Sequence, residues 1–112
     1  TIVLRDGRPI LAVGSPGGSA IVNYVVKTVI GVLDWNLDVQ QAIDLPNFGN
    51  RNFGAIELER GTPLADLKPA LEALGHRVNV AEFTSGLHAI RIFPDRLEGG
   101  ADPRREGIAL GD

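Results

Sequence analysis

The segment Gly14-Ser15-Pro16-Gly17-Gly18-Ser19 constrains this chain more than any other part of its sequence. It contains three glycines and a proline, and a long apolar run follows directly. Because an ordered glycine loses more backbone freedom than any other residue, such a cluster indicates a sharp turn or a close approach to the main chain. At a helix N-terminus, unpaired N–H groups and the helix dipole also favour an anion. The segment therefore predicts a strand-to-helix turn, an anion site, or both.

Spacing excludes two common phosphate-binding motifs in this segment. A Walker loop needs Gly-Lys at the fifth and sixth positions after its first glycine, but Ser19 stands five residues after Gly14 and the first lysine is Lys27. A dinucleotide fingerprint needs glycine at its third position, where this chain has Pro16. The readings that remain for Gly17 and Gly18 are an oxyanion hole built from two backbone N–H groups and a plain turn.

Hydrophobic periodicity and turn signals predict the order strand, strand, helix, helix, strand, helix, strand, strand. Asp38 and Thr62 are the expected helix N-caps, and Pro69 should kink or restart the third helix. Hairpins rather than repeated strand-helix crossovers are expected between the strands, so the predicted fold class is α+β. The expected strands cover residues 2–5, 9–13, 56–58, 77–80 and 87–93, and residues 97–101 are a candidate for one further strand. The expected helices cover 19–33, 39–44 and 63–74, with a loop over 46–54.

Composition and charge argue against several classes of function. The chain has 112 residues, of which 44% are hydrophobic, as expected of a single domain with its own core. Its formal net charge is -3 and its basic residues are scattered, so we expect no nucleic-acid partner. There is no cysteine, which removes disulfides and thiolate chemistry. His76 and His88 lack ligand spacing, so no metal site is expected.

Four segments, in this order along the chain, resemble the C-terminal part of the small subunit of γ-glutamyltranspeptidases. The family patterns are P-T-I-V with a following D-G, G-S-P-G-G-S, E-A-[IV]-x-x-P-R-[FW], and [GA]-A-x-D-P-R-R-x-G. The matching segments of this chain are Thr1-Ile2-Val3-Leu4-Arg5-Asp6-Gly7, residues 14–19, Gln41-Ala42-Ile43-Asp44-Leu45-Pro46 and Ala101-Asp102-Pro103-Arg104-Arg105-Glu106-Gly107.

The resemblance implies an N-terminal-nucleophile (Ntn) hydrolase with a four-layer αββα sandwich, made as a precursor that cuts itself into a large and a small subunit. The new N-terminal threonine attacks the γ-glutamyl carbonyl of glutathione or a related amide, and the acyl group passes to water or to an acceptor amine. Gly17 and Gly18 match the glycines that supply the oxyanion hole, and no cofactor is implied. Such enzymes are commonly periplasmic, secreted or membrane-anchored.

On this reading, residues 1–112 are one incomplete domain whose partners are the large subunit and the remainder of the small subunit. The chain begins with threonine and contains no methionine, so we expect a processed product, a cloned fragment or the ordered part of something longer. Thr1 matches the threonine of P-T-I-V and not the family's nucleophile, which lies upstream. The chain alone should therefore be inactive.

Several positions leave alternatives open. Pro46-Asn47-Phe48 replaces the family's P-R-[FW], and residues 49–53 lack its common histidine pair. Another γ-glutamyl substrate, a cephalosporin-acylase-like hydrolase of the same fold, or a non-catalytic module that retains the scaffold therefore stay open. We further expect Trp35 to pack on the core, Arg104 and Arg105 to pair with carboxylates of the partner subunit, and apolar faces to be exposed.

Overall fold

The structure is a computed structural model that describes residues 1–52 and 54–111. The chain forms two compact units, of which the first combines Thr1–Leu45 with the segment that starts at Ser85, and the second is Pro46–Thr84. Helices and strands are mixed in the chain, as the α+β prediction requires.

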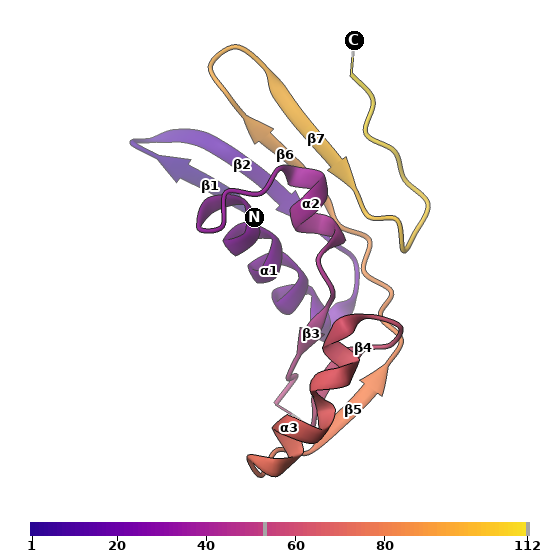
Figure 1. Cartoon of the computed structure of the whole chain (residues 1–112). Helices are drawn as coiled ribbons and strands as arrows, with labels where there is room; N and C mark the ends of the chain where they lie inside the picture. The colour runs from indigo at the N-terminus through magenta and orange to yellow at the C-terminus, as the bar shows by residue number, and fades with distance from the viewer. Residues whose placement is uncertain (53, 112) are drawn as a thin grey trace. The chain divides into compact units, whose positions relative to one another are not determined.

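The first unit is built on a four-stranded antiparallel sheet, in the order β1-β2-β6-β7 (Figure 1). Asp6 and Gly7 join β1 to β2 with φ values of 51° and 75°, and positive φ at both positions is what a two-residue type I′ hairpin turn requires. The predicted hairpin is therefore confirmed. The strands are β1 (Ile2–Arg5), β2 (Arg8–Gly14), β6 (His88–Ile92) and β7 (Leu97–Ala101).

One face of this sheet is covered by the helices α1 (Ile21–Leu33) and α2 (Val39–Asp44), with a short 3-10 turn, η1 (Gly18–Ala20), leading into α1. Leu11, Val13 and Ala89 are buried there. A Cβ atom on Gly100 of β7 would lie 2.8 Å from Val39 Cγ1 and 2.9 Å from Ile43 Cδ1. Helix α2 therefore packs directly against the backbone of β7.

Helix α1 was expected to be buried on more than one side, and this expectation was wrong. Its buried face is Tyr24, Lys27, Thr28, Gly31 and Val32, whereas Val22 and Val26 are exposed. Trp35 was expected on the core but is 60% exposed, because α1 ends at Leu33 and the chain turns at Asn36, which has a positive φ of 54°.

Helix α2 starts as its sequence predicts. The side chain of Asp38 accepts a hydrogen bond from the Gln41 N–H at 2.7 Å, and the Asp38 N–H donates to Gln41 Oε1 at 3.1 Å. These two bonds form a capping box, which satisfies two N–H groups at the helix start.

The second unit holds a three-stranded sheet in the order β3-β4-β5. The short strand β3 (Phe48–Gly49) lies within the segment expected to be a loop and pairs antiparallel with β4 (Ile56–Glu59), while Phe53 lies outside the described residues. Strands β4 and β5 (Val78–Ala81) are parallel, so the expected strand, helix and strand of this segment form one crossover.

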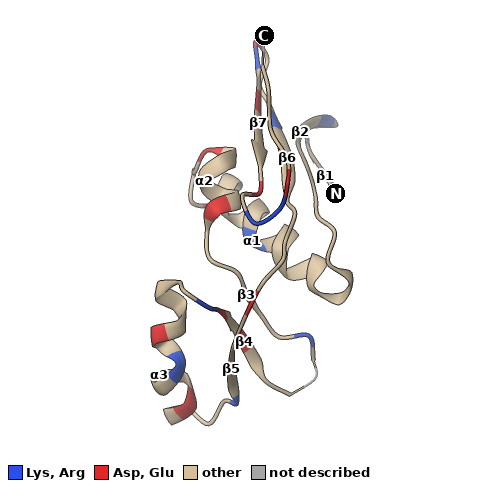
Figure 2. Cartoon of the chain, turned by 90° about the vertical axis from the view of Figure 1, so that its right-hand side faces the viewer, with Lys and Arg blue, Asp and Glu red and all other residues tan. Residues whose placement is uncertain are grey.

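The crossover is formed by η2 (Pro63–Leu67) and α3 (Lys68–Ala73). The division falls next to Pro69, which confirms the predicted restart. Thr62 was expected to cap this helix, but its hydroxyl donates to the Glu59 carbonyl at 2.8 Å and caps no N–H. Acidic and basic segments are mixed along α3 in Figure 2, and Lys68 and Glu72 form an ion pair on it.

Candidate functional site

The loop between β2 and η1 places two glycines in backbone conformations that other residues rarely adopt. Gly17 has a φ of 141° and Gly18 a φ of 57°. A Cβ atom on Gly17 would lie 2.7 Å from Cε2 of the buried Tyr24, whereas a Cβ on Gly18 would meet nothing within 4 Å. Position 17 therefore requires glycine for both its φ and its packing, and position 18 for its φ alone.

The N–H groups of these glycines point to no acceptor within the described part of the chain. Gly17 and Gly18 are exposed, and among residues 1–52 and 54–111 neither N–H donates a hydrogen bond. The Gly17 carbonyl accepts from the Ala20 N–H at 3.1 Å, which closes the first turn of η1. Because η1 runs on into α1, both donors stand at the positive end of a helix dipole. This arrangement is suited to an anionic oxygen.

A second segment of the first unit, residues 85–87, holds this loop in place. The Ser15 hydroxyl donates to the Pro16 carbonyl at 2.7 Å and accepts from the Gly86 N–H at 3.1 Å. A Cβ atom on Gly86 would lie 3.0 Å from Cγ of Pro16, so the backbone of Gly86 lies directly against the proline ring.

Asp102 is the buried acid of this unit, with an exposed fraction of 1%. Burial by itself would raise the pKa of its carboxyl group, but hydrogen bonds from the Ser85 hydroxyl, the Arg104 and Leu87 N–H groups and the Arg104 guanidinium outweigh it and hold the pKa below its ordinary value. The carboxylate is therefore ionised at neutral pH.

Two cations meet the C-terminal end of α2. The buried Lys27 Nζ donates to the Ile43 and Leu45 carbonyls at 3.0 and 2.6 Å, and the Arg104 guanidinium donates to the same two carbonyls at 3.4 and 3.2 Å. Arg104 also pairs with Asp102 at 3.1 Å. Arg104 was expected to pair with a partner subunit, and that expectation is corrected because its partner is within this chain.

Sequence reasoning missed the role of Lys27, although a signal was present. Lys27 follows Tyr24 by three residues and precedes Gly31 by four, so it shares the helical face that these residues bury. A lysine in the middle of a buried face requires hydrogen-bond acceptors nearby, and the end of the next helix supplies them.

Thr1 lies in the strand ladder. Its nitrogen donates to the Val13 carbonyl and the Val13 N–H donates to the Thr1 carbonyl, both at 2.9 Å. A nitrogen engaged in this way is not placed as a base for its own hydroxyl. His76 and His88 are both exposed, and no cluster of three or more metal-ligating side chains occurs in the described ranges.

Asn47, which stands where the family pattern has arginine, is buried in the second unit. Its N–H donates to Glu59 Oε2 at 2.6 Å, and its carbonyl accepts from the Glu59 N–H at 3.0 Å. Through these two bonds Asn47 joins its loop to β4. On the same loop, Arg51 Nε donates to Glu57 Oε2 of β4 at 2.8 Å.

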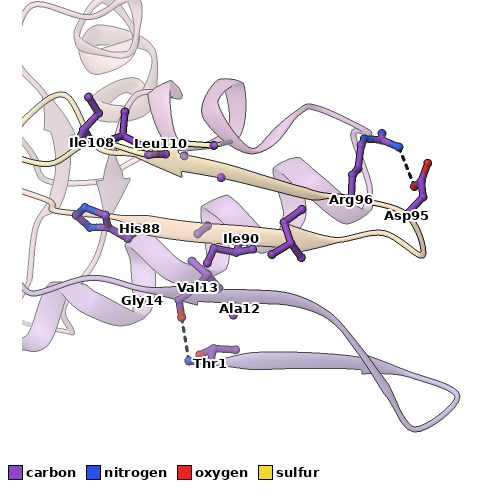
Figure 3. A pocket seen from close by; sticks show the side chains of 16 residues that line it. Thr1, Ala12, Val13, Gly14, His88, Ile90, Asp95, Arg96, Ile108 and Leu110 are labelled. Carbon is purple, nitrogen blue, oxygen red and sulfur yellow. Dashed lines mark hydrogen bonds and ion pairs between the residues drawn. The ribbon is translucent and has the colours of Figure 1, made fainter.

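The sheet face opposite the helices carries a groove in the first unit. Ile90 and Leu97 are exposed on its floor and edge, Ile108 and Leu110 of the tail border it, and Thr1 lies beside β2 (Figure 3). Asp95 and Arg96 stand at the turn between β6 and β7. Within the described residues, no helix has the length and apolar character to cross a membrane.

Comparison with known proteins identifies the family. The sequence pattern of the family described as gamma-glutamyltranspeptidase matches residues 1–112. This chain belongs to that family. The glutathione hydrolase proenzyme of Escherichia coli strain K12 is 37% identical over 106 residues, which are 93% of this chain and 18% of the relative. The chain thus spans about a fifth of the length of the curated relatives it matches.

Two further relatives describe the range of the family. The Acylase ACY 1 proenzyme of Pseudomonas sp. strain SE83 is 32% identical over 97% of this chain and 20% of the relative. The structure of the gamma-glutamyltranspeptidase of Pseudomonas nitroreducens in complex with L-DON superimposes with a TM-score of 0.87 and 27% identity, over all of this chain and 60% of the solved one. The mixed α+β fold is therefore that of the gamma-glutamyltranspeptidases.

Proposed function

We propose that this chain is part of a γ-glutamyltransferase and glutathione hydrolase, in which the N–H groups of Gly17 and Gly18 form the oxyanion hole. The observation that carries this proposal is the pair of adjacent, exposed N–H groups that donate to no described residue at the start of η1. Relatives named glutathione hydrolase proenzymes support the reaction class.

The chemistry follows from what two such donors stabilise. A hydroxyl oxygen carried by another part of the enzyme adds to the γ-glutamyl carbonyl carbon and gives its proton to a base, and the carbonyl oxygen takes the electron pair as an oxyanion. The two N–H groups bind that charge more strongly than the neutral carbonyl, which lowers the barrier. Collapse of the intermediate breaks the C–N bond, the amine leaves with a proton, and an acyl ester remains for water or an acceptor amine.

The apolar outer face of the sheet supports the rest of the proposal. Ile90, Leu97 and Ile108 are exposed there, on the side opposite α1 and α2. A second sheet stacked on this face, with helices on its own outer side, would complete the four layers of an Ntn hydrolase. In this proposal residues 1–112 are one incomplete domain, the partners are the large subunit and the remainder of the small subunit, and the chain by itself is inactive.

The test compares two substitutions of Gly18 in the full-length protein that contains this chain. Gly18→Pro removes the N–H and cannot keep a φ of 57°, whereas Gly18→Ala keeps the N–H in open space. With a γ-glutamyl anilide as substrate, Gly18→Pro should lower kcat by roughly 10²- to 10³-fold, with a much smaller effect on KM. Gly18→Ala should retain most of the activity.

Gly7→Ala is the control, because Gly7 has a φ of 75° and open space but lies in the β1–β2 turn. It should leave kcat unchanged. A folded Gly18→Pro protein with full activity would contradict the proposed oxyanion hole.

A second candidate is an acylase that acts on substrates without an α-amino group. The Pseudomonas acylase relative favours it. Glutaryl anilide matches γ-glutamyl anilide but lacks the amine, so the ratio of kcat/KM for the two substrates separates the candidates. The γ-glutamyl enzyme should prefer the amine-bearing substrate, whereas a preference for the glutaryl compound would identify the acylase.

A further inference from the structure

The buried carboxylate of Asp102 reaches both sequence neighbours of Gly86. The Ser85 hydroxyl donates to it, and the Leu87 N–H donates to Oδ2 at 3.1 Å. In return the Asp102 N–H donates to the Leu87 carbonyl at 2.8 Å. With a bond on each side, the carboxylate fixes the backbone of residues 85–87.

Gly86 in turn contacts the glycine loop in two ways. Its N–H donates to Ser15 Oγ at 3.1 Å, and the place where its Cβ would stand is 3.0 Å from Cγ and 3.1 Å from Cδ of Pro16. Pro16 directly precedes Gly17. Because the backbone of Gly86 packs closely against Pro16, we expect a shift of residues 85–87 to shift Pro16 and the two N–H groups that follow it.

Asp102 is itself held from the other side of the unit. The Arg104 N–H and guanidinium donate to its Oδ1 at 3.0 and 3.1 Å. The same guanidinium donates to the carbonyls of Ile43 and Leu45 at the end of α2. The carboxylate, which is 1% exposed, therefore connects the end of α2 to the loop that leads into η1 and α1.

We propose that Asp102 is a positioning residue for the oxyanion hole, which sets the direction of the Gly17 and Gly18 N–H groups through Gly86, Ser15 and Pro16. This inference rests on the proposed function of the glycine loop. Asp102 touches no substrate in this proposal. It acts through a chain of short contacts that ends one residue before Gly17.

A double-mutant cycle in the full-length protein tests the proposal, with Asp102→Asn, Ser15→Ala and their combination. Asp102→Asn removes the charge that receives four donors, and Ser15→Ala removes the acceptor of the Gly86 N–H. Because a misplacement of about 1 Å can cost about 10²-fold, each single variant should lower kcat by roughly 10- to 100-fold and change KM by less than about twofold. Asp6→Asn, in the exposed β1–β2 turn, is the matched control and should leave kcat unchanged.

The decisive result is the double variant. If both residues act through one chain of contacts, its loss of kcat should be much smaller than the product of the two single losses. Hydrogen exchange of the peptide that carries residues 85–87 should also quicken in Asp102→Asn. Independent, multiplicative effects would overturn the proposal, and so would an unchanged kcat accompanied only by a lower Tm.

The outcome also separates this inference from the function on which it rests. If Gly18→Pro keeps full activity, the oxyanion hole itself is refuted. If Gly18→Pro is inactive while Asp102→Asn and Ser15→Ala retain full kcat, only the positioning role is refuted. Should Asp102→Asn not fold, Ser85→Ala replaces it in the cycle, since it removes one donor and leaves the charge paired with Arg104.

Discussion

Adjacent glycines in the loop should respond very differently to the same small substitution. In Gly17→Ala, the new methyl group would lie 2.7 Å from Cε2 and 3.4 Å from Cδ2 of Tyr24, which is itself only 4% exposed. The ring cannot swing out to solvent, so the contact must be relieved by moving the loop. Overpacking of this kind costs about 1 to 3 kcal/mol, and the backbone strain of a non-glycine residue at a φ of 141° adds about 1 to 3 kcal/mol.

Gly18→Ala places its methyl group in open space and carries only the cost of a left-handed φ, about 1 to 2 kcal/mol. Gly7→Ala has the same kind of φ in open space and should match it. Thermal unfolding of the three full-length variants should therefore show the largest fall in Tm for Gly17→Ala, with smaller and similar falls for the other two.

The same displacement of the loop should also lower kcat in Gly17→Ala. Relief of the Tyr24 contact displaces the N–H groups, so kcat of Gly17→Ala should fall along with its stability, whereas Gly18→Ala should keep most of its kcat. Equal stability losses at positions 17 and 18, or a fully active Gly17→Ala, would refute the packing argument.

Three other perturbations test the contacts around the site. Because the pKa of Asp102 is held below its ordinary value, the ionised carboxylate stabilises the fold at neutral pH, and this stabilisation is lost as the pH falls below about 4. The Tm of the wild-type protein should therefore fall more steeply between about pH 5 and 2 than that of Asp102→Asn. Parallel curves of Tm against pH would contradict this. Lys27→Met removes a buried donor from two carbonyls and should lower the free energy of unfolding by about 1 to 3 kcal/mol in urea titrations. Lys68, whose side chain is partly exposed, is the control: Lys68→Met should lower this free energy by less than about 0.5 kcal/mol, and equal effects would count against the buried role of Lys27. Gly100→Ala should lower the free energy of unfolding by about 1 to 3 kcal/mol, because its methyl group would meet Val39 and Ile43 of α2. In the control Gly99→Ala, the methyl group meets only Ala109 of the exposed tail. Similar losses of stability in the two variants would refute the close contact between α2 and the sheet.

Local signals made much of the fold predictable. The Asp6-Gly7 turn, the Asp38 cap and the restart at Pro69 each depend on residues within a few positions of one another, and the structure confirms all three. The pattern of four motifs also identified the family, which no single motif could do. The predicted strands were found with no boundary shifted by more than one residue.

The errors share a physical cause, which is dependence on distant residues. Helix α1 has apolar residues on several faces, and only the packing of the sheet and α2 decides that Val22 is exposed while Lys27 is buried. The hydroxyl of Thr62 could either cap its helix or donate backward to Glu59, and local sequence does not choose between these. The guanidinium of Arg104 binds the carbonyls of Ile43 and Leu45 at the end of α2, which lie 61 and 59 residues earlier in the chain.

For the glycine loop, local sequence predicted the turn but not the segment that supports it. Its conformation was predictable because only glycine suits the positive φ values of positions 17 and 18. The segment that supports it was not, since Gly86 lies 71 residues from Ser15 and its neighbours are held by a carboxylate further along the chain.

The most direct measurement is a crystal structure of the full-length protein with a γ-glutamyl boronate, whose tetrahedral adduct carries an oxygen in the place of the oxyanion. The account predicts that this oxygen lies about 2.7 to 3.1 Å from the backbone nitrogens of both Gly17 and Gly18. An adduct oxygen bound by other groups, with these two N–H groups directed away from it, would contradict the account.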